Sequence, residues 1–201
     1  MHRTYRLMST AAAAVLVGGL ALVSPASAVP TPPKDGVGTV SCSKMSGSLK
    51  FSPALTYPGT QPTTITFTTV LNGCSGTGDG ANVRSGKSVQ TINAPTNDCL
   101  SLLNAAGQPR SGTLKWMAKP YTRALTASTV DLTSGSGTQG PPITVDTNGS
   151  VSAGSFTGDT VTAHTIVKET LALLTARCTS VKGLAAIHFA TGSTASFDAL
   201  G

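Results

Sequence analysis

The chain has 201 residues with 14 Lys+Arg against 8 Asp+Glu, and only 11% of its residues are charged. Its formal net charge of +6 is too small for the dense basic face that phosphate-backbone binding requires, so we expect no nucleic-acid partner. A chain of this length usually forms one domain around one core. Threonine, serine and glycine are abundant, which predicts a surface that is polar without being strongly ionic.

Residues 1–28 have the features of a secretory signal peptide. Arg3 and Arg6 form a basic start, residues 11–23 form an apolar stretch, and small residues end the segment at Ala28. The apolar stretch is diluted by alanine and glycine and is short for a membrane span. We therefore expect cleavage after Ala28, a secreted, extracellular protein and no membrane span after cleavage. The mature chain keeps 12 Lys+Arg against 8 Asp+Glu, a net charge of +4.

Four cysteines follow the signal peptide and predict two disulfides, because export takes them to an oxidising compartment. Three pairings are possible, and we favour Cys42 with Cys74 and Cys99 with Cys178, because this arrangement needs no crossing. Loop-closure entropy gives these bonds about 3.7 and 4.5 kcal/mol of stabilisation. The cysteine spacing does not suit zinc, and we expect no metal and no cofactor.

Alternating apolar residues predict short strands throughout residues 37–201, after a flexible, proline-rich arm at residues 29–36. The clearest strand is residues 63–74, in which isoleucine, phenylalanine and leucine share one face and threonines the other. In residues 113–118, Trp116 has the same parity as the leucine two residues before it. Trp116, the only tryptophan, is therefore expected in the core.

Two pairs of later strands are expected to form hairpins around glycine-containing turns: residues 143–146 with 151–156 around Asn148-Gly149, and residues 184–190 with 194–197 around Gly192. Residues 169–177 fit helical spacing about as well as alternation, and we predict one short helical segment there. Short strands with turn signals about every eight to twelve residues favour an all-β fold, an antiparallel β-sandwich in a single domain. A closed β-barrel is the alternative.

Five features occur together along the chain. They are the export signal, a cysteine ahead of the run at residues 47–53, a Thr-Ile-Thr-Phe strand that ends at Gly73-Cys74, the strand with Trp116, and the Gly-Ser-Phe-Thr-Gly run at residues 154–158. With these features the chain resembles uncharacterised secreted β-sandwich proteins of actinobacteria. The resemblance covers most of the mature chain. Its motifs are structural, so it implies a fold and an extracellular location and no active-site residues.

Candidate catalytic residues are sparse. A hydrolytic triad needs a nucleophile, a base and an orienting group, and the two histidines of the mature chain, His164 and His188, lie within predicted strands. Ser155 lies in a glycine-flanked run that does not match the nucleophile elbow. Glu169 is the only glutamate, and the aspartates lie mostly at turns or strand ends, which does not suggest a glycosidase pair. The sequence favours a non-catalytic protein, with a secreted hydrolase using His164 or His188 as the alternative.

The densest basic segment is the one candidate ligand surface in the sequence: Arg110, Lys115, Lys119 and Arg123, interleaved with Trp116 and Tyr121. Cations beside aromatic rings are typical of surfaces that bind polyanions or glycans. Trp116, however, has inward parity, so a solvated strand face explains the same residues. We therefore expect an exported non-catalytic binding or envelope-associated protein. The sequence does not identify the ligand of this protein. The partners that we consider are a cell-envelope polymer and another exported protein.

Overall fold

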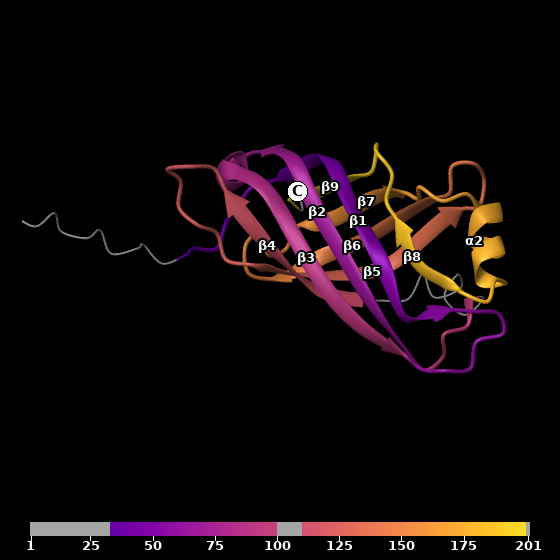
Figure 1. Ribbon diagram of the computed structural model, residues 1–201. Coiled ribbons are helices and arrows are strands. Elements are labelled where there is room, and N and C mark those ends of the chain that lie inside the picture. The colour runs from indigo at the N-terminus through magenta and orange to yellow at the C-terminus, as the bar shows by residue number, and fades with distance from the viewer. Residues whose placement is uncertain (1–32, 100–109, 200–201) are drawn as a thin grey trace, which may run out of the picture. The chain divides into compact units, whose positions relative to one another are not determined.

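The computed structural model describes residues 33–99 and 110–199 (Figure 1). The predicted signal peptide and the first part of the proline-rich arm lie outside the described residues. The described chain contains nine strands, one short 3-10 helix and one α-helix: β1 (Val40–Leu55), β2 (Thr63–Gly76), η1 (Gly78–Asn82), β3 (Val83–Ala94), β4 (Arg110–Ala118), β5 (Ser128–Thr138), β6 (Thr144–Ala153), β7 (Thr160–Ile166), α2 (Leu171–Cys178), β8 (Leu184–His188) and β9 (Thr194–Asp198).

The strands form one antiparallel sheet that closes on itself. Each of β1 to β6 pairs with the next strand along the chain, and β9 pairs with both β7 and β1. The closed ring has eight strands, β1 to β7 and β9. Strand β8 pairs with the second half of β1. In Figure 1, β1, β2 and β3 run side by side, and β5, β6 and β7 pass behind them in this view. The all-β prediction is confirmed, and the sheet forms the barrel rather than the sandwich that the sequence favoured.

The hairpin expected around Gly192 is wrong. Leu49 pairs with Ile187 of β8, and Cys42 pairs with Ala195 of β9, so both strands run antiparallel to the same β1. Because β1 is 16 residues long, it holds two short strands one after the other along its edge. The two strands therefore complete one side of the barrel and do not fold back on each other.

The hairpin expected at Asn148-Gly149 is also wrong, because β6 continues through both residues. Gly149 is paired with Leu132 next to a register shift in β5. A Cβ atom added at Gly149 would lie 2.2 Å from the carbonyl oxygen of Asp131. Glycine is required here for close approach to an irregular neighbouring strand, and not for a turn.

Trp116 is the centre of the larger of two apolar clusters. Its ring lies 5.2 Å from that of Phe156 and 5.0 Å from that of Phe197, both in edge-to-face geometry. Trp116 is only 8% exposed, which confirms the core prediction. Leu125, in the loop before β5, also belongs to this cluster, and its other buried members come from strands of the ring: Val40, Cys42, Met45, Leu71, Cys74, Val83, Leu114, Val151, Val161 and Ala195.

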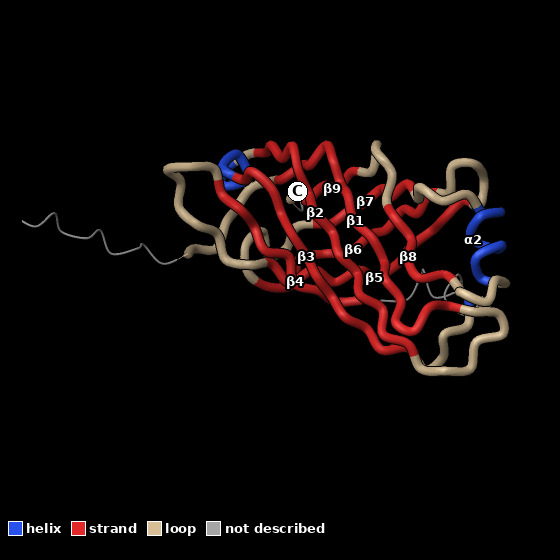
Figure 2. Tube along the Cα trace, in the orientation of Figure 1, coloured by secondary structure: helices blue, strands red, loops and turns tan. Residues whose placement is uncertain are grey.

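The second cluster contains α2 and one disulfide. Leu174 and Cys178 of α2 are buried against side chains of β1, β2 and β8, including Phe51. The Thr170 side chain accepts a hydrogen bond from the backbone of Leu173 and so caps the start of the helix. The predicted helical segment is confirmed at Leu171–Cys178, and Figure 2 shows it as a short helix among strands and loops.

Both predicted disulfides are present. Cys42 and Cys74 are direct cross-strand partners on β1 and β2. Cys99, shortly after β3, is bonded to Cys178 at the end of α2. In the part of the chain that the structure describes, no helix is long and apolar enough to cross a membrane.

The end of the proline-rich arm contacts the barrel. Lys34 forms a parallel bridge with Leu125, and its ammonium group lies 2.6 Å from Oδ1 of Asp79. The backbone N–H of Gly36 donates to the buried hydroxyl of Ser155. This hydrogen bond connects the arm to the loop that precedes β7.

Candidate functional sites

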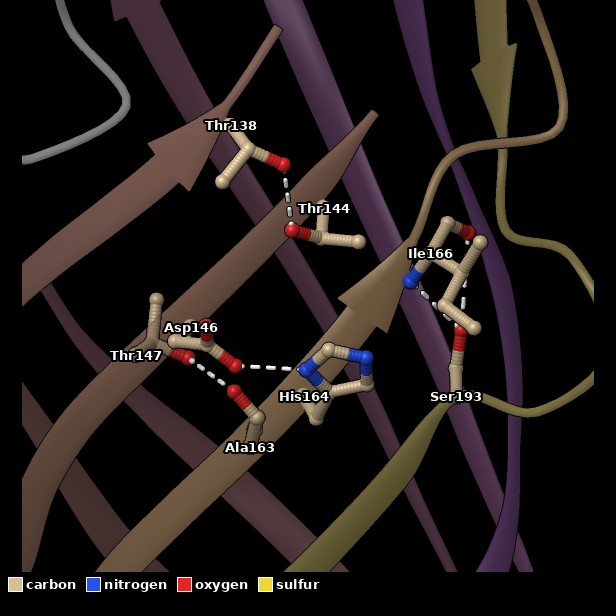
Figure 3. Close-up of polar contacts among 8 residues, drawn as sticks. All are labelled: Thr138, Thr144, Asp146, Thr147, Ala163, His164, Ile166 and Ser193. Carbon is tan, nitrogen blue, oxygen red and sulfur yellow. Dashed lines mark hydrogen bonds and ion pairs between the residues drawn. The ribbon is translucent and has the colours of Figure 1, made fainter. Parts of the chain in front are cut away.

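His164 and Asp146 form a pair on the outer face of the barrel. They are direct partners in the β6–β7 ladder, and Nδ1 of His164 lies 2.6 Å from Oδ1 of Asp146 (Figure 3). Both side chains are about half exposed. A carboxylate on Nδ1 orients an imidazole and leaves Nε2 available for proton exchange, which is the arrangement of a base and its orienting group.

This pair lines a shallow depression of about 590 Å³ across β6, β7, β9 and β1. The depression is rich in hydroxyl and amide groups, from Ser41, Ser43, Asn148, Thr162, Thr194 and Ser196. Thr194 is the in-register neighbour of His164 on β9. Among the described residues, however, no hydroxyl donates to Nε2 of His164, so the arrangement contains a base and an orienting group without a positioned nucleophile.

His188 and Glu169 form a second pair with a different setting. Glu169 immediately precedes the cap of α2, and its carboxylate accepts the backbone N–H of His188 at 2.9 Å and lies 2.7 Å from Nδ1. Glu169 is only 7% exposed. Burial raises the pKa of this carboxyl, but the hydrogen bonds from His188 together outweigh burial and hold the pKa below its usual value. The contacts between Glu169 and His188 connect the start of α2 to the end of β8.

The residues of the basic segment singled out in the sequence lie on both faces of β4 and in the loop after it. Lys115 points outward from β4, whereas Arg110 shares the parity of Trp116 and is half-buried, and burial lowers the pKa of its guanidinium. The ammonium group of Lys119 donates to the carbonyl of Ala81 at 2.7 Å. Tyr121 and Arg123 lie exposed in the loop after β4, Tyr121 with a φ of 65°.

Charge is instead sorted by strand. Strands β1 to β4 contain six basic residues and no acid: Lys44, Lys50, Arg84, Lys87, Arg110 and Lys115. Strands β5, β6, β7 and β9 contain three aspartates and no lysine or arginine: Asp131, Asp146 and Asp198. Five of the six bases are exposed, with Arg110 as the exception. We call the outward face of β1 to β4, with these five bases, the cationic wall.

The closest pair on the cationic wall is Lys87 and Lys115. They are direct partners in the β3–β4 ladder, and both are exposed. The basic segment of the sequence includes Lys115 but not Lys87, because the two residues are distant in the chain and only the strand register brings them together.

Metal ligation has no support in the described residues, where no group of three or more His, Cys, Asp or Glu side chains could hold an ion. Comparisons with protein-family models, with curated proteins and with solved structures found no match to the chain. Function is therefore inferred from the residues and geometry of this chain.

Proposed function

We propose that this protein is an exported, non-catalytic binding protein that associates with the cell envelope through the cationic wall. The observation that carries this proposal is the sorting of charge by strand, with every strand base on β1 to β4 and every strand aspartate on the other side of the ring. A surface with one sign of charge attracts partners of the opposite sign and orients their approach. A net charge of +4 on the mature chain understates this effect, because β1 to β4 contain no acid.

Export is supported by two independent features. The signal-peptide pattern of residues 1–28 would direct the chain out of the cytoplasm. Two disulfides, with no free cysteine, fit an oxidising compartment. The resemblance to secreted actinobacterial β-proteins points to the same location.

Both histidine pairs can be explained by structural roles. The Glu169 carboxylate uses both oxygens on His188 and so connects α2 to β8. Asp146 and His164 bridge neighbouring strands at in-register positions. These roles support a protein that acts by binding rather than by catalysis.

Co-sedimentation tests the proposal. Protein secreted into the medium under its own signal sequence is purified and mixed with the insoluble envelope fraction of the producing cells. We expect it to pellet at low salt and to be released as salt rises, because exposed charges are screened. Protein that stays in the supernatant at every salt concentration would overturn the proposed function.

A secreted hydrolase remains the second candidate, and the 2.6 Å contact between His164 and Asp146 in a hydroxyl-lined depression favours it. Turnover of ester, peptide and glycan substrates is measured for the wild type and for His164→Ala and His188→Ala. The hydrolase candidate predicts turnover that disappears in one of these variants and survives in the other. Such a result would replace the non-catalytic proposal.

A further inference from the structure

We propose that the ligand of the cationic wall is a linear polyanion, bound across β3 and β4 at Lys87 and Lys115. This inference rests on the proposed function and names the ligand class of the same surface.

Lys87 and Lys115 lie directly opposite each other in the β3–β4 ladder. Like charges directly opposite each other in an antiparallel ladder repel and weaken the sheet. Among the described residues, neither ammonium group has an acidic partner. Asp131 is the acid of the adjacent strand β5, but it pairs with Ser111, four residues along β4 from Lys115, about 13 Å away. A bound anion would neutralise both lysines at once.

The neighbouring bases extend this pair into a strip. Arg84 lies three residues before Lys87 on β3, a rise of about 10 Å, and is exposed at the register shift between Val83 and Ser85, where strict alternation is interrupted. Lys44 pairs with Asn72, which in turn pairs with Ser85, so Lys44 lies two strands away from Arg84, about 10 Å. Cations repeated at this spacing suit a chain that carries one charge per unit, rather than a single small anion.

Uncharged residues next to the bases suit the skeleton of such a chain. Val89 and Met117 are exposed beside Lys87 and Lys115. The hydroxyl-bearing residues Thr91 and Thr113 are exposed further along the same two strands. Apolar side chains contact carbon backbones, while hydroxyls bind oxygen atoms of sugars or polyols. Lysine presents a compact point charge that accepts carboxylate and phosphate groups alike. The shared chemistry is therefore a flexible polymer with repeated anionic groups.

Two defined polymers test the proposal: polygalacturonate, which carries carboxylates, and long-chain polyphosphate. Binding is measured by titration calorimetry for the wild type and for Lys87→Gln/Lys115→Gln. The control variant Lys168→Gln/Lys182→Gln loses the same net charge at exposed lysines outside the cationic wall. A second variant, Lys87→Arg/Lys115→Arg, keeps the charge.

We expect the wild type to bind one or both polymers, and the polymer that binds identifies the anionic group. Lys87→Gln/Lys115→Gln should weaken binding about 10- to 30-fold, whereas the arginine variant and the control should stay within about twofold. Circular dichroism checks that every variant is folded.

Several outcomes would overturn the inference. Equal binding by the wild type and Lys87→Gln/Lys115→Gln would show that the two lysines are not the binding site. Equal weakening in the control variant would show that binding depends on net charge alone. Binding to phosphatidylglycerol vesicles but to neither polymer would identify a membrane surface instead. Co-sedimentation with the envelope without binding to either polymer would overturn the ligand class and leave the proposed function standing. Failure of both assays would overturn both.

Discussion

The indole Nε1–H of Trp116 donates to the hydroxyl of Ser128 across 2.7 Å inside the barrel. Ser128 in turn donates to the backbone carbonyl of Ser155 at 2.5 Å and is completely buried. A single serine therefore satisfies a buried donor on β4 and a buried acceptor in the loop before β7. The same loop receives the N–H of Gly36, so this network joins the sheet to the end of the arm.

Ser128→Ala should lower the free energy of unfolding by about 2–3 kcal/mol, because it leaves both the indole N–H and the Ser155 carbonyl without a partner. Urea unfolding followed by far-UV circular dichroism measures this loss. Ser46→Ala, at an exposed position of β1, is the control and should change stability by less than about 0.5 kcal/mol. In a Trp116→Phe background, Ser128→Ala should cost less. An undiminished cost there would show that the hydrogen bond is not the source.

Glu169→Gln should destabilise the protein by about 1–3 kcal/mol at pH 7. The carboxylate of Glu169 contacts the backbone N–H and Nδ1 of His188 with its two oxygens, and in the variant the side-chain NH₂ of glutamine would replace one of them and face a hydrogen-bond donor. The pKa of Glu169 is held below its usual value in the folded state. Its carboxylate therefore stabilises the fold above the unfolded-state pKa, near 4.5, and this contribution is lost as pH falls through the lower folded-state pKa. Thermal unfolding of both proteins from pH 7 to pH 3 measures the difference. A gap that stays constant over this range would contradict the assignment.

Asp159 is expected to show the opposite pH dependence. It is 6% exposed, and its Oδ2 is buried without a hydrogen-bond partner among the described residues. Burial, and then the charge of Asp198, raise the pKa of Asp159 above its ordinary value of 3.8. The ionised carboxylate thus destabilises the fold above the raised pKa, and the cost disappears as pH falls below 3.8.

Asp159→Asn should accordingly stabilise the protein by about 1 kcal/mol at pH 7 and have little effect at pH 3. Urea unfolding at the two pH values is the measurement. A variant that is less stable than the wild type at pH 7 would show that the buried carboxylate is favourable.

The strands and the core could be predicted because their signals are local. Alternation placed Trp116 inside, and the four cysteines together with the predicted export signal indicated the two disulfides. Barrel closure could not be chosen over a sandwich, because it depends on β1 pairing with β2 on one side and with β8 and β9, which are distant in the chain, on the other. Alternation specifies which face of a strand is buried but not which strands meet.

The candidate sites were harder to predict for the same reason. Asn148-Gly149 was predicted to be a turn, so the predicted strand ended near Asp146 and its pairing with the strand of His164 was not recognised. In the structure β6 is uninterrupted, and Asp146 and His164 are direct partners. The absence of acids from β1 to β4 could have been counted from the sequence. Its meaning required the strand order, which places Lys87 beside Lys115.

The salt dependence of binding tests the role of Lys87 and Lys115 most directly. Cations that contact a polyanion release its condensed counterions, so the logarithm of the binding constant falls linearly with the logarithm of salt concentration. The measurement uses the polymer that the wild type binds, from about 50 to 300 mM NaCl. Lys87→Gln/Lys115→Gln should reduce the slope by about one to two, and Lys168→Gln/Lys182→Gln should leave it unchanged. Identical slopes for the wild type and Lys87→Gln/Lys115→Gln would contradict a binding surface at this pair.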